Sequence, residues 1–397
     1  MTLEDILGVA GKTLVMSEGD MRTYVFARKL HPSKEIREMQ LSGLREVVIH
    51  NAKHVDEVER ESIVGRERQG AIKYIPEKSS EPHFYVPETG RLHIVNSRGV
   101  IRLKRDEDLA KSLGYFLGRD IELFVNHYEG ASSKASHRFE HFAFQLVEDA
   151  FQHIDSEAFV RNQRFNVILG PHASLDTSDV VVKHAHESEY LNYRVLKVGN
   201  EVALNFDYIF GDQARDILHK VYLVLSSDFR GLEEVNVFHY GKVGILKPGL
   251  EIGQIVVPVG SIDEEKILAG KGSIFPLDNE LSGNSQNPLA GFFERYVGQK
   301  VATGVTVNTI SVVGQTIEDL ELDRNAGGDV LDMEWAAMAG TSVGSGSTYP
   351  WLKRIRYFLA GTGSDKPLEG KNLGNTEYPV QNERLIANAM KEIIRRL

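Results

Sequence analysis

From about residue 160 onward, short apolar runs alternate with segments of helical spacing, and this alternation constrains the fold more than any other feature. Residues 164–170, 201–206 and 234–239 are predicted to be buried strands, and residues 211–225 are predicted to be a helix. Because strands that alternate with helices require crossover connections, we expect a largely parallel sheet with helices on both faces. The pattern continues with strand candidates at 254–258, 301–311, 329–333 and 354–360 and with a last helix at 380–397.

The first part of the chain has a different pattern. Residues 45–50 are a short strand candidate, and residues 83–86 and 91–95 flank a turn, which predicts a hairpin. Residues 139–151 have the apolar spacing of a helix. We therefore expect two domains: a mixed α/β (α+β) N-terminal domain of unknown role over 1–158, and a second α/β domain over 159–397.

The composition of the 397 residues bounds the function. Apolar residues make up 42% of the chain, enough for a sizeable core, and no cysteine is present. Disulfides, thiolate metal sites and cysteine nucleophiles are therefore excluded. The net charge of −10 argues against nucleic acid or an anionic membrane as the main partner. No signal peptide is visible, and no apolar run approaches the roughly 20 residues of a membrane span, so we expect a soluble cytoplasmic protein.

Two glycines stand where the predicted strand 234–239 ends. Gly241 and Gly244 have no side chains, so backbone N–H groups can approach a ligand or a bound water closely. A tight turn into the next strand explains the same glycines without any function. These residues alone leave both interpretations open.

Two acidic residues also follow predicted strands. Glu334 comes after Met333 at the carboxyl end of a strand, where open α/β sheets bind their ligands. A carboxylate can accept hydrogen bonds from both hydroxyls of a ribose diol, but the helix dipole also favours a Glu at a helix N-terminus, and taken alone Glu334 fits that structural interpretation better. Asp365 follows the strand 354–360 and can act as a general acid or belong to an Asp-x-Pro turn.

Taken together, these motifs resemble a known family. The glycine-rich residues 241–257, the run from Asp332 to Glu334 before alanines, and a strand that ends in Ser364 and Asp365 are similar to the purine nucleoside phosphorylase and nucleosidase superfamily. The resemblance covers roughly residues 160–397. It is strongest for the hydrolytic members, which are the methylthioadenosine/adenosylhomocysteine nucleosidases and the AMP nucleosidases. It implies a three-layer α/β/α sandwich as the catalytic domain, with a separate N-terminal domain as in AMP nucleosidases.

The resemblance implies a role for each matching residue. Asp365 would be the general acid at the purine, and Glu334 would hold the ribose hydroxyls, with Met333 packed under the sugar. Gly241 and Gly244 would line the floor of the site near the nucleophile. The other predicted substrate-binding residues are Lys242, Ser311, Val312, Ser364 and Lys366.

The attacking nucleophile can be water or phosphate. Phosphorylases of this superfamily place an arginine where this chain has His239, which favours water. Lys242 stands where relatives have Ser or Thr, and it can either bind a phosphate group or form a salt bridge away from the substrate. We therefore expect hydrolysis of the N-glycosidic bond of a purine nucleoside or nucleotide, in purine metabolism and nucleotide salvage. A phosphate-dependent phosphorylase and a non-catalytic binding module are the alternatives.

The expected partners follow from this interpretation. They are a small purine nucleoside or nucleotide and, if the alternative holds, phosphate. We expect no metal and no organic cofactor. Since sites in the superfamily are often completed by a neighbouring subunit, we also expect a homo-oligomer.

Overall fold

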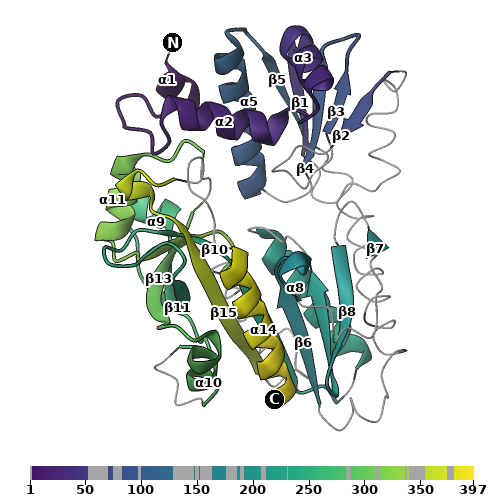
Figure 1. Cartoon of the computed structure of the whole chain (residues 1–397), viewed down its shortest axis with the longest axis vertical. Coiled ribbons are helices and arrows are strands. Elements are labelled where there is room, and N and C mark those ends of the chain that lie inside the picture. Colours follow the sequence, from purple (N-terminus) through teal and green to yellow (C-terminus); the bar gives the residue numbers. More distant parts are fainter. Residues whose placement is uncertain are drawn as a thin grey trace. The chain divides into compact units, whose positions relative to one another are not determined.

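The computed structural model divides into two compact units (Figure 1). Unit 1 comprises Met1–Arg138, Ile310–Leu320 and Asn372–Asn375, and unit 2 comprises Phe139–Thr309, Glu321–Lys371 and Thr376–Leu397. The structure describes residues 2–51, 70–74, 83–96, 100–127, 147, 152, 163–175, 186–187, 192–206, 212–229, 231–282, 288–309, 313–335, 338, 354–372 and 380–397.

Two of the expectations fall on the gaps between these ranges. The predicted helix over 139–151 lies outside the described residues, Val147 excepted. The boundary expected at 158/159 stays a prediction, because only Gln152 is described between 148 and 162. Within the described ranges, no helix has both the length and the apolar character that a membrane crossing needs.

Unit 1 contains a five-stranded sheet in the order β2-β3-β4-β1-β5. The strands are β1 (Glu46–Asn51), β2 (Ile72–Tyr74), β3 (His83–Val86), β4 (Arg91–Asn96) and β5 (Glu122–His127). The central strand β1 pairs in parallel with β4 and β5, whereas β3 pairs antiparallel with β2 and β4. The predicted hairpin is thus confirmed as β3 and β4. At its turn, Gly90 has φ +70°, and a side chain there would stand 2.1 Å from the backbone oxygen of Gly43, so only glycine fits.

The helices of unit 1 begin at hydroxyl caps. Thr2, Ser17 and Ser33 each accept a hydrogen bond from a backbone amide three residues ahead, which satisfies a donor that the helix start would leave unpaired. The helices are α1 (Leu3–Leu7), α2 (Glu18–Lys29), α3 (Lys34–Gly43) and α5 (Val100–Leu117). The core cluster of this unit joins α2 and α5 to one face of the sheet, through residues such as Val25 and Leu113.

Unit 2 is built on a ten-stranded mixed sheet, in the order β12-β11-β13-β14-β10-β6-β9-β8-β7, with β15 paired to both β10 and β11. Its strands are β6 (Arg164–Leu169), β7 (His186–Glu187), β8 (Asn192–Val198), β9 (Glu201–Phe206), β10 (Glu234–Ile245), β11 (Ile255–Asp263), β12 (Phe275–Pro276), β13 (Ala302–Asn308), β14 (Val330–Asp332) and β15 (Arg354–Asp365). The expected parallel core is present, because β10 pairs in parallel with both β6 and β15, and β6 pairs in parallel with β9.

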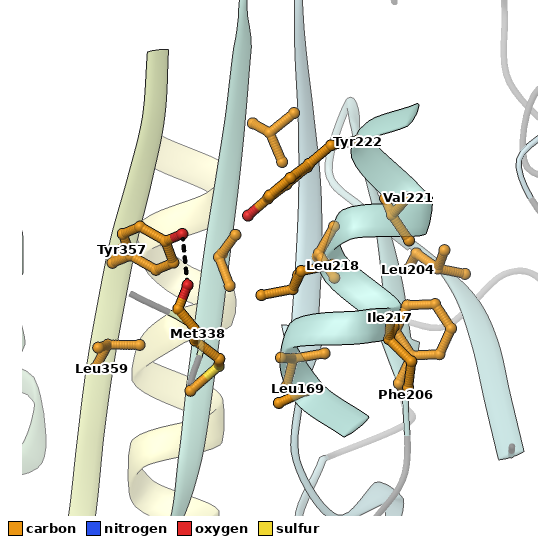
Figure 2. Close-up of a cluster of buried hydrophobic side chains, with 14 of the residues drawn as sticks. Leu169, Leu204, Phe206, Ile217, Leu218, Val221, Tyr222, Met338, Tyr357 and Leu359 are labelled. Atoms are coloured by element: carbon orange, nitrogen blue, oxygen red, sulfur yellow. Dashed lines mark hydrogen bonds between the residues drawn. The ribbon is translucent and has the colours of Figure 1, made fainter. Parts of the chain in front are cut away.

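Helices of unit 2 contribute to two separate core clusters on this sheet. Helix α8 (Asp212–Asp228) packs with β6, β9 and β15 in one cluster, and Figure 2 shows its Ile217, Leu218, Val221 and Tyr222 in the same cluster as Leu169 and Phe206. The other cluster contains the last helix α14 (Val380–Arg396), which was predicted from its apolar spacing. Two further described helices of this unit are α9 (Glu264–Leu268) and α10 (Pro288–Val297), and α11 (Ile317–Asn325) begins in unit 1 and ends in unit 2.

The two longest strands differ from their predicted extent. The prediction ended one strand at 239 and the other at 360, whereas β10 continues to Ile245 and β15 to Asp365. The two strands pair in parallel over this whole length, with Gly241 beside Gly361. The added hydrogen bonds extend a strand through glycines whose own propensity is low. Gly241 and Gly244 therefore lie inside a strand, and Asp365 is the last residue of its strand.

Candidate active site at the ends of β10, β14 and β15

Three strands bring the predicted acids to one end of the sheet. Gly244 of β10 is in register with Leu331 of β14 on one side and with Asp365 of β15 on the other. Since neighbouring strands lie about 4.8 Å apart, the backbones of β14 and β15 are roughly 10 Å apart here. Asp332, the last residue of β14, follows Leu331, and Glu334 lies two residues further on. The end of β10 thus lies between the carboxyl group of Asp365 at the end of β15 and the carboxyl groups of Asp332 and Glu334 at the end of β14 and just after it.

Asp365 is a buried carboxyl group with a single side-chain partner among the described residues. It is 6% exposed, and burial raises its pKa to about 6, although the Ser364 hydroxyl and the charge of Lys242 both act to lower it. Ser364 Oγ lies 2.5 Å from Asp365 Oδ1 and 3.1 Å from the carbonyl oxygen of Val243. The one hydroxyl proton can serve only one of these acceptors. When it serves the carbonyl, Ser364 Oγ can accept a hydrogen bond from the O–H of neutral Asp365, so the contact suits a carboxyl group that gains and loses a proton.

Asp332 organises the turn that carries Glu334. Its Oδ1 accepts hydrogen bonds from the backbone amides of Glu334, at 2.8 Å, and of Trp335, at 2.5 Å. This is the arrangement by which an Asp caps the start of a helix. Burial raises the pKa of Asp332, whereas these amide bonds and a side-chain hydrogen bond with Glu334 lower it. This side-chain hydrogen bond ties half-buried Glu334 to Asp332 at the turn.

Trp335 and His239 form a buried pair beside this turn. The indole of Trp335 is fully buried, and its Nε1–H donates to Nδ1 of His239 at 2.8 Å with the two rings perpendicular. Burial lowers the pKa of His239 to about 3, so its imidazole is neutral at pH 7. The indole also packs over β15, because a side chain at Gly361 would stand 3.1 Å from its ring. Because Gly361 has no side chain, the Trp335 ring can pack directly against the backbone of β15.

The other predicted substrate-binding residues differ in their surroundings. Lys242 is exposed and lies within electrostatic reach of Asp365, and Met333 is half-buried between the two acids of the turn. Lys366 is buried, and its ammonium group lies 2.6 Å from Glu369 and 3.6 Å from Glu251. Its role at the substrate stays a prediction. Ser311 and Val312, the predicted contacts to the base, lie outside the described residues.

Two features of the site were not predicted from the sequence. Asp332 belongs to the matching motif, but its capping role depends on which amides turn toward it. The pairing of His239 with Trp335 joins residues 96 positions apart, so no local pattern contains it. Among the residues that the structure describes, no group of three or more His, Asp or Glu side chains could hold a metal ion.

Comparison with known proteins found no matching family model and no matching curated protein. Among solved structures, the chain is similar to the 5'-methylthioadenosine/S-adenosyl homocysteine nucleosidase of Campylobacter jejuni, with 16% identity, a TM-score of 0.41, and coverage of 58% of this chain and 99% of that one. It is also similar to the futalosine hydrolase of Helicobacter pylori, with 14% identity, a TM-score of 0.44, and coverage of 60% and 100%. The corresponding values for the S-adenosylhomocysteine nucleosidase of Streptococcus pyogenes are 13%, 0.42, 59% and 97%.

Proposed function

We propose that unit 2 hydrolyses the N-glycosidic bond of a purine nucleoside or nucleotide. The observation that carries this proposal is Asp365, a buried carboxyl group at a strand's carboxyl end whose pKa is raised to about 6. A general acid works best when its pKa lies near the operating pH, since it must both hold and release a proton. The motif resemblance supplies the purine and the ribose, and the geometry supports the division of roles among the acids.

Each acid has a separate task in this reaction. The C1′–N bond breaks with its electron pair moving to the base, and Asp365 gives the departing base its proton. Glu334 accepts hydrogen bonds from the ribose hydroxyls, and its contact with Asp332 holds its carboxylate in place. Water adds its oxygen to C1′ and releases one proton, so that the net reaction consumes one water and yields free base and free sugar.

Water is favoured over phosphate as the nucleophile by the state of His239. A bound phosphate dianion needs positive charge or several donors around it. The residue that stands in place of the phosphorylase arginine is a neutral imidazole whose Nδ1 already accepts from Trp335. Lys242 is exposed beside the site and is a candidate ligand for a 5′-phosphate on the substrate. A nucleotide substrate is therefore compatible with hydrolysis.

The test is a panel of purine nucleosides and nucleotides, with and without phosphate, scored for free base and for the sugar product. We expect base release that does not require phosphate, and Asp365→Asn should lower turnover on the order of 10²–10⁴-fold. Asp323→Asn is the matched control, because Asp323 is an equally buried acid in α11 of the same unit. Base release that yields a sugar 1-phosphate would establish the phosphorylase instead. Ligand binding without any base release would indicate a non-catalytic module.

Lys242→Ala tests the 5′ substituent. If Lys242 binds a 5′-phosphate, the variant should lose preference for nucleotides over nucleosides while nucleoside hydrolysis persists. Lys247→Ala is the matched control, since Lys247 is exposed on the same segment and pairs with Asp329 at 3.1 Å. Unchanged nucleotide preference in Lys242→Ala would contradict the assignment.

The sandwich architecture and the assembly are part of the same proposal. Core clusters that contain α8 on one side and α14 on the other support a three-layer nucleoside-phosphorylase-type arrangement for unit 2. We also expect a homo-oligomer, and sedimentation of the full chain measures its order. A monomer with full turnover would refute a site completed by a second subunit.

A further inference from the structure

The His239–Trp335 pair has a chemical property that its burial alone does not require. An indole N–H can only donate a hydrogen bond, so the nitrogen that faces it must be an acceptor. Trp335 Nε1 lies 2.8 Å from Nδ1 of His239, which places the ring proton of the imidazole on Nε2. Protonating Nδ1 as well would set two N–H groups against each other. The indole therefore holds His239 in one tautomer, in which Nε2 is a donor and cannot be a base.

The direction of this donor follows from the glycine beside it. A side chain at Gly241 would stand 3.3 Å from Cε1 and 3.8 Å from Nε2 of His239, so this edge of the ring faces along β10 toward its carboxyl end. His239 is 5% exposed, and its hydrogen bond with the described residues is the one that Nδ1 accepts from Trp335. Nε2 is not among the fully buried polar atoms that lack a partner, so its N–H is open to an acceptor on a ligand or a water.

His239 and Asp365 approach the end of β10 from opposite faces. Side chains alternate along a strand, so His239 and Gly241 share the face of Val243, while Lys242 and Gly244 share the other. Val243 packs in the cluster with α8, and Tyr240, on the face of Lys242, packs in the cluster with α14. Asp365 Oδ1 lies 3.6 Å from the position of a Gly244 side chain, on the Lys242 face. For both groups to act on one substrate, the sugar must lie across the end of β10, and a displacement at C1′ then has the nucleophile and the leaving base on opposite sides of the sugar.

We infer that His239 is a further catalytic residue, whose Nε2–H donates a hydrogen bond to the oxygen that attacks C1′, and that Trp335 is the positioning residue that keeps it a donor. The inference rests on the proposed glycosidic cleavage. The imidazole takes no proton in this step: it orients a lone pair of the attacking water toward C1′, and the proton that water loses goes to solvent. A neutral donor suits water, and one oxygen of phosphate would accept from it in the same way.

Two substitutions separate this role from a structural one. In His239→Asn, the amide oxygen can stand near the position of Nδ1 and accept from Trp335, but the Nε2 donor is lost. In His239→Gln, the amide nitrogen can reach the position of Nε2, but the Trp335 N–H loses its acceptor. If His239 binds the nucleophile, Asn should lower kcat on the order of 10²-fold with little change in KM or melting temperature. Gln should keep more of kcat but melt roughly 2 to 12 °C lower.

The experiment measures kcat, KM and melting temperature for the full chain and both variants, with water and with added phosphate as nucleophile. Trp335→Phe removes the indole donor, so it should lower kcat. It should also allow His239 to populate both neutral tautomers, which the ¹⁵N chemical shifts of its two ring nitrogens would show. If kcat of the two variants simply follows their melting temperatures, so that His239→Gln is less active than His239→Asn, then His239 does not have the proposed role. If base release requires phosphate and is slower in His239→Asn, then His239 donates to a phosphate oxygen, and the assignment of water as the nucleophile is wrong. No base release by the wild-type chain overturns the proposed function, and the role of His239 with it.

Discussion

Replacing Asp365 by Asn should stabilise the protein near neutral pH while it removes activity. The pKa of Asp365 rises from its ordinary value of 3.8 to about 6, mainly because the carboxyl group is buried. A raised pKa means that the folded state favours the protonated carboxyl group, so the contribution to stability is fully present below about pH 4 and is lost as the pH rises through about 6. At 1.36 kcal/mol for each of the roughly two pH units between these values, the loss is about 3 kcal/mol.

The assay is urea unfolding of the wild-type chain and of Asp365→Asn from pH 4 to 8. Their difference in unfolding free energy should change by up to about 3 kcal/mol between pH 4 and 6 and then stay level, with the variant gaining relative stability as the pH rises. Ser364→Ala removes a hydrogen bond that lowers the pKa of Asp365, so it should move the upper end of this window to higher pH. If the wild type and Asp365→Asn respond to pH in parallel over the whole range, the carboxyl group is not held protonated by burial and the acid role fails. The same acid requires turnover to fall as the pH rises above about 6.

Three further substitutions test the packing around the site and in unit 1. Gly361→Ala would put a methyl group 2.7 Å from Val243 and 3.1 Å from the Trp335 ring, so we expect a loss of roughly 1–3 kcal/mol in urea unfolding together with lost turnover; an unchanged protein would contradict the close packing. Tyr357→Phe removes the 3.1 Å hydrogen bond to the backbone oxygen of Met338 (Figure 2) and should cost about 1 kcal/mol in the same assay. Asp106→Asn separates the ion pair with Lys29, both 1% exposed, and should cost roughly 3 kcal/mol or more, measured by hydrogen exchange in α2; slow exchange as in the wild type would refute it.

Local pattern was sufficient for the elements that bury a clear apolar face. The strands β6, β9 and β10 and the helix α14 lie where the spacing of apolar residues places them. The residues that the motif analysis singled out come from strands that lie side by side, since Gly244 is in register with both Leu331 and Asp365; that they form a site stays a prediction. The strands and the helix depend on residues that are close together in the sequence, and the motifs occur in an order that the resembling family shares.

Features that depend on distant partners could not be predicted in this way. The extension of β10 past Gly241 requires β15, which begins more than a hundred residues later and supplies the hydrogen bonds. The tautomer of His239 depends on its hydrogen bond with Trp335, and nothing in the sequence around either residue predicts that the two are in contact. The raised pKa of Asp365 comes from burial, which is a property of the packed sheet and not of its own segment.

The segment that joins β13 to β14 shows how a distant partner also bears on the domain boundary. Residues 310–320 belong to unit 1 by their contacts, although β13 and β14 belong to unit 2. Val313 is 2% exposed in the core cluster of unit 1. Glu318 accepts hydrogen bonds from the backbone amide and the hydroxyl of Thr13, at 2.9 and 3.0 Å, and the amide of Ile317 donates to the carbonyl of Thr13 at 2.8 Å. A fragment that begins at residue 159 would lack all of these partners.

We therefore expect fragment 159–397 to lose order at this segment before it loses the sheet. Without Thr13 the amide of Ile317 has no acceptor, and without the core of unit 1 Val313 is exposed to water, so local opening should cost little free energy. Hydrogen exchange followed by mass spectrometry should show fast exchange at 313–320 in the fragment and slow exchange in the full chain. The amides of β10 serve as the internal control, because their partners β6 and β15 remain in the fragment. Equal protection of Ile317 in both proteins would show that unit 2 alone holds the segment and would contradict this expectation.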